Sequence, residues 1–141
     1  KVDFWVVDKT GVGQGVYDRM KEMDYPIRGV SFGEKSEDLQ YANLKAEWHF
    51  KLRKWIVGGG KLKQDYGWNE LEVVRYKHKD SKIIIQPKEE LFRDGISSPN
   101  VVDAAVLTMV MEDSAIKSAR VIKQRYGREF FDATDRIWRN E

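Results

Sequence analysis

The chain has 141 residues, enough for one domain with a hydrophobic core of ordinary size. Apolar residues make up 41% of it and aromatic residues 12%, which indicates a folded protein and not a disordered one. The absence of cysteine excludes disulfides, zinc–thiolate sites and thiol catalysis. The formal net charge of +2 neither requires nor excludes a polyanionic partner, and no apolar run reaches the roughly 20 residues of a membrane-spanning helix.

The first half of the chain predicts two strands separated by a helix. Residues 4–7 form a short apolar run typical of a central strand covered on both faces, and residues 12–23 carry apolar side chains at helical spacing. A second strand is predicted at 27–32, and this order favours a parallel pair with a right-handed crossover. A polar loop at 33–40 precedes the clearest helix, at 41–57, which ends at three consecutive glycines.

The second half predicts shorter elements. We expect a short helix at 68–73, then a hairpin with strands at 73–76 and 83–85 around residues 78–81. Ser98 is expected to cap a helix that has Pro99 at its first position and runs to about residue 112. The remaining charged, periodic tail is expected to be a docking helix. The domain organisation we predict is therefore an α/β domain over residues 1–112 and a C-terminal helical extension over 113–141.

Three glycines alternate between the first strand and the first helix, at Gly11, Gly13 and Gly15. A dinucleotide-binding loop has the pattern Gly-x-Gly-x-x-Gly, but Val16 occupies the place of the third glycine here. The phosphate-loop pattern that ends in Gly-Lys-Ser/Thr is also absent. A tight strand-to-helix turn is the simpler interpretation, and a nucleotide-binding α/β domain stays open as an alternative.

Two acids lie in unusual positions. Asp8 ends a predicted buried strand, where open α/β sheets place their ligands, although it could simply cap the loop amides that follow. Asp103 lies in the segment 101–111, where all the remaining residues are apolar except Thr108. We therefore expect a helix that is buried on all sides. A buried carboxylate needs a cation or several donors. A salt bridge would satisfy Asp103, but two such acids suggest a shared Mg²⁺ or Mn²⁺.

Four segments occur in a specific order and spacing: VVDKTGVGQGVYDRM, IRGVSFG, NLKAEWHFKLRKWI and SSPNVVDAAVLT. Over roughly residues 3–110 they resemble the C-terminal nuclease domain of the large terminase subunit of tailed bacteriophages. The resemblance implies a ribonuclease-H-like fold, a mixed sheet flanked by helices, and a metal-dependent endonuclease that cuts double-stranded viral DNA during packaging. The partners that it implies are double-stranded DNA, the terminase ATPase domain, the small terminase subunit and the portal, in the host cytoplasm and without a membrane.

The resemblance also implies site residues. Asp8 matches the second acid of the family, and Asp103 matches the acid of its late helix, in the pattern Ser-Pro-x-x-x-Asp-Ala, so both are expected to be catalytic and to bind the metal. Asn100 stands where relatives often have an acid or a histidine, and it can act as a weak ligand through its carbonyl. The family's first metal-binding aspartate lies on a strand before the one that ends at Asp8. We find no counterpart for it and expect an N-terminally incomplete domain.

Basic residues form two groups that could contact DNA phosphates, although a solvated face is the simpler alternative for each. One group lies at the end of the long helix: Lys51, Arg53, Lys54, Lys61 and Lys63. The other lies on the hairpin, which we prefer as the DNA contact, through Arg75, Lys77, Lys79 and Lys82. Lys88 is expected to approach the acids, and His49 to be a packed or surface histidine and not a catalytic base.

The leading hypothesis is therefore a phage terminase nuclease domain in which Asp8 and Asp103 face one another across an open, acidic cleft. Two alternatives remain. One is a catalytically inactive prophage remnant that only binds nucleic acid, and the other is the nucleotide-binding α/β domain.

Overall fold

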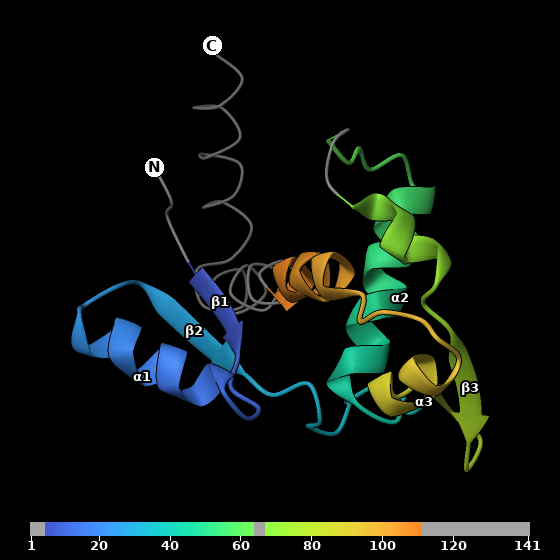
Figure 1. Cartoon of the computed structure of the whole chain (residues 1–141), viewed down its shortest axis with the longest axis horizontal. Coiled ribbons are helices and arrows are strands. Elements are labelled where there is room, and N and C mark those ends of the chain that lie inside the picture. Colours follow the sequence, from blue (N-terminus) through green and yellow to red (C-terminus); the bar gives the residue numbers. More distant parts are fainter. Residues whose placement is uncertain (1–4, 64–66, 111–141) are drawn as a thin grey trace, which may run out of the picture. The chain divides into compact units, whose positions relative to one another are not determined.

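The computed structural model describes residues 5–63 and 67–110. The chain divides into two compact units, Lys1–Met109 and Val110–Glu141. The predicted C-terminal extension and the helical tail lie outside the described residues. The described part contains helices together with one parallel and one antiparallel pair of strands (Figure 1). This mixture confirms the α/β class. Within it, no helix combines the length and apolarity needed to cross a membrane.

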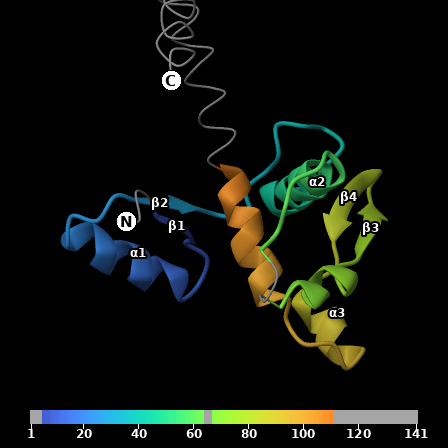
Figure 2. The same ribbon diagram turned by 90° about the horizontal axis from the view of Figure 1, so that it is seen from above.

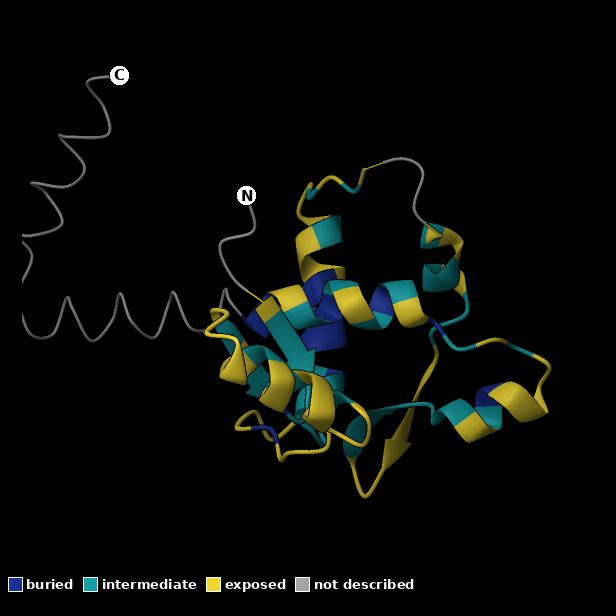
Figure 3. Ribbon diagram, turned by 60° about the vertical axis from the view of Figure 1, so that its left-hand side comes forward, coloured by how far each residue is buried: buried dark blue, intermediate teal, exposed yellow. Residues whose placement is uncertain are grey.

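The first elements form the predicted strand–helix–strand unit. β1 (Trp5–Asp8) and β2 (Ile27–Val30) are parallel, and α1 (Gly13–Glu22) contacts both. Hydrogen bonds from Trp5 N to Pro26 O (2.9 Å) and from Lys9 N to Val30 O (2.7 Å) extend the ladder at its two ends. Among the described residues this sheet has only two strands, and α1 buries no side chain (Figure 3). The expectation that β1 is covered on both faces is therefore wrong for the described part, because Trp5 is exposed and the other three residues of β1 are half-buried.

The glycine-rich connection is a tight turn. Gly11 has a φ of +64°, which favours glycine, and a Cβ added at Gly13 would collide with the carbonyl oxygen of Asp8. Gly15 has open space around it and needs no glycine. The strand-to-helix interpretation is confirmed, and the turn brings the start of α1 close against the end of β1.

α2 (Leu44–Val57) is the helix around which the second half of the chain packs. Asn43 caps it by accepting a hydrogen bond from Ala46 N at 3.0 Å, which is why it begins three residues after the predicted position 41. The loop after β2 is fixed to its first turn, because Lys45 N donates to Phe32 O at 3.1 Å and the Phe32 and Trp48 rings lie 5.9 Å apart. Gly58 and Gly59, the latter with a φ of +97°, end the helix as predicted.

Residues 100–110 form a second long helix, which lies beside α2 in both Figure 1 and Figure 2. The two helices carry most of the buried core: Ala46, Trp48, Leu52, Val102, Val106 and Met109. The expectation of burial on all sides is wrong, because Ala104 and Thr108 are exposed, and a small alanine leaves little apolar surface in water.

The cap of this helix also differs from the prediction. Glu70, in the 3-10 helix η1 (Trp68–Glu72), accepts hydrogen bonds from Val101 N at 2.7 Å and Val102 N at 3.3 Å. The Ser98 hydroxyl instead donates to Asn100 Oδ1 at 2.8 Å, so the predicted serine cap is wrong. A carboxylate is favoured at this position because it complements the partial positive charge of the helix N-terminus.

The hairpin is present with shifted boundaries. β3 (Tyr76–Lys79) and β4 (Lys82–Ile85) are antiparallel and are joined by a two-residue turn. Asp80 and Ser81 both have positive φ, 50° and 63°, as primed hairpin turns require. The predicted first strand at 73–76 is therefore wrong for all but Tyr76. β4 contacts α2 (Figure 2), and the short helix α3 (Lys88–Arg93), which the sequence did not predict, follows it.

Candidate functional site

A cavity of about 400 Å³ lies at the end of β1. Its walls come from the β1–α1 turn, the loop after β2, the first turn of α2, α3 and the helix at 100–110. The lining residues are Asp8, Thr10, Phe32, Gly33, Lys45, Lys88, Asn100, Asp103, Ala104 and Leu107. The structure thus brings together all the acids and the amide that the sequence singled out, together with Lys88.

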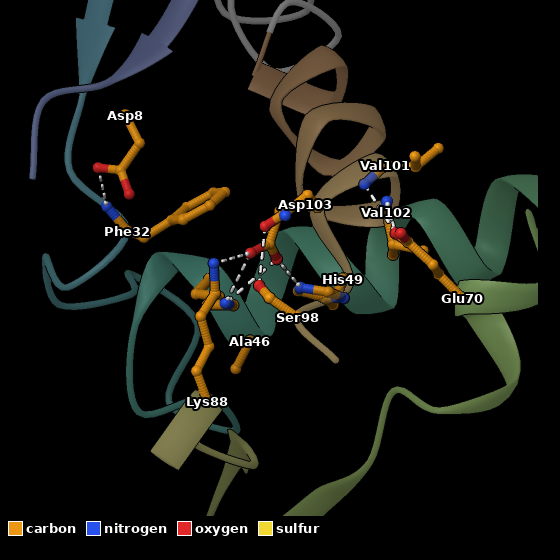
Figure 4. Close-up of polar contacts among 12 residues, drawn as sticks. Asp8, Phe32, Ala46, His49, Glu70, Lys88, Ser98, Val101, Val102 and Asp103 are labelled. Carbon is orange, nitrogen blue, oxygen red and sulfur yellow. Dashed lines mark hydrogen bonds and ion pairs between the residues drawn. The ribbon is translucent and has the colours of Figure 1, made fainter. Parts of the chain in front are cut away.

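Asp8 is held in place through one of its two oxygens. Oδ1 accepts hydrogen bonds from Thr10 N at 3.0 Å and from Thr10 Oγ1 at 2.7 Å. It also accepts one from Phe32 N at 3.4 Å (Figure 4). Within the described part of the chain, Oδ2 has no hydrogen-bond or ion-pair partner. Asp8 therefore does cap the loop, as the simpler alternative proposed, and still has one oxygen available for a ligand.

Asp103 lies in a network of basic groups (Figure 4). Lys45 Nζ is 3.1 Å from Oδ1, Lys88 Nζ is 3.1 Å from Oδ2, and His49 Nε2 is 3.3 Å from Oδ1. The Asp103 side chain is only 13% exposed, and that of His49 is 5% exposed. The buried acid is thus satisfied by salt bridges, the alternative to a metal that the sequence left open.

The pKa values of this network follow from burial and charge. Burial by itself would raise the pKa of the Asp103 carboxyl, but the hydrogen bond from His49 and the positive charge of Lys45 outweigh it and hold that pKa well below its usual range. Burial lowers the pKa of His49, and Asp103 offsets this only in part. At neutral pH, His49 is therefore an uncharged imidazole that donates from Nε2–H to an ionised Asp103.

The expected acidic character of the cleft is wrong. Asp8 and Asp103 share the cavity with Lys45 and Lys88, so its formal charges balance. Lys45 Nζ also lies 5.5 Å from the centre of the Phe32 ring, and in the view of Figure 4 this ring lies between the two acids. No group of three or more acids or histidines suited to a metal occurs among residues 5–63 and 67–110.

Two members of the network, Lys45 and His49, were not predicted as partners of Asp103. They are four residues apart on α2 and so lie on one face of the helix, which was the available signal. Lys88 approaches the acids as expected, because α3 places it there. His49 is 7% exposed, which confirms that it is packed.

The hairpin residues predicted to contact DNA lie mostly on one face. Lys77 and Lys79 alternate with Tyr76 and His78 along β3, and Lys82 pairs with Lys79 across the turn, so these three lysines share a face. Lys77 Nζ is 2.6 Å from the Glu90 carboxylate on α3, so a phosphate would compete with this acid. Arg75, just before β3, lines a different cavity.

No family model, no curated protein and no solved structure matches this chain.

Proposed function

We propose that this chain is a divalent-metal-dependent endonuclease domain acting on double-stranded DNA, of the kind found in the large terminase subunit of tailed phages. One observation carries the proposal. Asp8, at the end of β1, lines a single cavity together with Asn100 and Asp103 from the helix at 100–110. A core strand and a late helix are the elements on which the resemblance expects metal ligands. The ribonuclease-H-like fold is part of this proposal.

The donor set fits a hard cation. Asp8, Asp103 and Asn100 would hold Mg²⁺ or Mn²⁺, since carboxylate and amide oxygens are their preferred ligands. Bound there, the metal would supply Lewis-acid chemistry for hydrolysis of a phosphodiester. Thr10 fixes Asp8 through Oδ1 and leaves Oδ2 for the ion.

The lysines have a defined part in this proposal. Lys45 and Lys88 neutralise the Asp103 carboxylate in the metal-free chain. A metal ion bound to Asp103 would neutralise it in their place. Lys88, with 41% of its side chain exposed, is then available for a DNA phosphate. The resemblance implies three acids and this cavity holds two, so we expect weak metal binding and slow cleavage.

Titration calorimetry with MnCl₂ tests the site. We expect the wild-type chain to bind Mn²⁺ weakly, and Asp8→Asn and Asp103→Asn to abolish the heat. Asp18→Asn is the matched control, because Asp18 is an exposed acid on α1 outside the cavity. If wild type and Asp103→Asn give the same heat, the metal does not bind where we propose.

Nicking of supercoiled plasmid with Mn²⁺ tests the activity. This chain should nick slowly, and a chain extended upstream by a strand that carries an aspartate should nick faster, because a two-metal site needs ligands on both sides. Equal rates for the extended chain and its Asp8→Asn variant would exclude this cavity as the catalytic site.

The hairpin is proposed as the main DNA contact. Its quadruple alanine variant should bind duplex DNA less tightly and with a flatter dependence on salt, because fewer counterions are released. The four changed residues are Arg75, Lys77, Lys79 and Lys82. A control variant loses the same charge elsewhere, at Arg19, Lys21, Arg28 and Lys35. Equal salt slopes for the two variants would mean that the hairpin is only a solvated surface.

One observation favours the catalytically inactive alternative. Both oxygens of Asp103 are engaged by basic groups, as in a structural ion pair. Hairpin-dependent DNA binding in a chain that gives no Mn²⁺ heat and no nicking, even after extension, would identify this second function.

A further inference from the structure

A second cavity, of about 370 Å³, lies on another side of α2. It is bordered by α2, by η1 and the segment after it, by the hairpin and by the helix at 100–110. Its walls are mainly apolar, with Leu52, Val74 and Ile85 each contributed by a different element. His49 lines this cavity, while its partner Asp103 lines the first, so the two sites are separate. The volume is in the range of small-molecule pockets, about 300–1,000 Å³.

The charge at this cavity has one sign. Arg53 on α2 and Arg75 before β3 both line it, and among the residues that the structure describes no aspartate or glutamate does. Both arginines are exposed, and neither guanidinium forms an ion pair or a hydrogen bond within residues 5–63 and 67–110. Tyr76, a residue 57% exposed, belongs to the same lining.

This combination selects for one chemistry. Apolar walls favour an apolar body, whereas the lack of any acid disfavours a metal ion or an amine. A guanidinium is planar and weakly hydrated, and it binds carboxylate, sulfonate or phosphate oxygens in pairs. Two guanidiniums from different elements, both without an ion-pair partner in the described part of the chain, therefore supply an anion site at the edge of an apolar cavity.

We propose that this cavity binds a small amphipathic anion, with its apolar body against Leu52, Val74 and Ile85 and its anionic group on Arg53 and Arg75. The site is separate from the proposed metal site, since none of these residues lines the cavity of Asp8 and Asp103, but it shares Arg75 with the proposed DNA contact.

Two fluorescent probes test this inference on the full chain. Anilinonaphthalene sulfonate has an aromatic body and an anion, and phenylnaphthylamine has a closely similar body without the charge. We expect saturable binding of the sulfonate, weakened about tenfold or more by Arg53→Gln with Arg75→Gln, since this double variant removes charge-assisted hydrogen bonds to the anionic group. The neutral probe should bind wild type and this variant equally.

Two further variants sharpen the result. Lys54→Gln is the matched control, because it removes an exposed positive charge from the same helix outside the cavity, and it should leave both probes unaffected. Val74→Trp should fill the cavity and abolish binding of both probes, with thermal unfolding monitored to establish that it folds. Sulfonate binding that survives both the arginine changes and Val74→Trp would overturn the proposal. Arginine changes that weaken both probes equally would also overturn it, because the occupant would then be an uncharged apolar group.

Discussion

Replacing Asp103 with alanine should destabilise the metal-free chain by about 3 kcal/mol, since removing one partner of a buried ion pair costs about 3–5 kcal/mol. The burial of its partners places the cost at the lower end of this range. His49, with 5% of its side chain exposed, cannot replace its lost acceptor with water, whereas Lys88, at 41%, can turn into solvent. Lys45 is intermediate at 21%.

Urea unfolding at pH 7.5, followed by circular dichroism without divalent metal, measures this free energy. Lys88→Met is the comparison variant and should cost about 1 kcal/mol or less, as exposed ion pairs do. If Asp103→Ala is as stable as the wild type or more stable, the carboxylate is an uncompensated charge. The structure predicts the opposite, because Lys45, His49 and Lys88 compensate the charge of Asp103.

The pH dependence provides a second check. The folded pKa of Asp103 lies below its unfolded value of about 4, so its contribution to stability is complete above that value and is lost as the pH falls toward the folded pKa. The difference in unfolding free energy between wild type and Asp103→Ala should thus be constant above about pH 7, where His49 is also neutral in both states, and should shrink below about pH 4. A difference that stays unchanged down to pH 3 would contradict the ion-pair assignment.

Two further variant pairs test the local geometry by urea unfolding. Glu70→Ala should cost about 1–2 kcal/mol, because it removes the cap from the helix at 100–110, while Glu72→Ala, exposed on the same 3-10 helix, should change stability by less than about 0.5 kcal/mol. Equal losses of stability in the two variants would show that Glu70 does not cap this helix. Gly13→Ala should cost about 1–3 kcal/mol because its Cβ meets the Asp8 carbonyl, whereas Gly15→Ala should be neutral or stabilising, since open space surrounds a helical glycine there. A tolerated Gly13→Ala would show that the turn after β1 relaxes easily.

Most of the elements could be predicted because their signals are local. The apolar stripe of α2, the glycines after it and the alternation of β1 with α1 and β2 are all properties of neighbouring residues. α3 was missed because KEELFR is only six residues long and mostly polar, which gives too little periodicity to detect. The hairpin register was misjudged because its turn, Asp80-Ser81, adopts positive φ without a glycine to signal it.

The candidate site was predictable only in part, for the same reason. Asp8 and Asp103 stood out against apolar surroundings, and both do line one cavity. The partners of Asp103 come from α2 and α3, and their convergence depends on how three helices pack, which no local pattern records. The cap at Val101 is a similar case, because it comes from Glu70 in a separate element.

α2 forms a wall of both cavities, through Lys45 on one side and His49 and Arg53 on the other. An α-helix advances about 100° per residue, so deleting one residue between Lys45 and His49 would rotate everything after it by that angle. A single deletion would therefore move His49 away from Asp103 and Arg53 away from the apolar cavity. Insertions and deletions should therefore be tolerated in the hairpin turn or in the glycine segment after α2. Within the first two turns of α2, even one residue gained or lost would remove α2 side chains from the lining of both cavities.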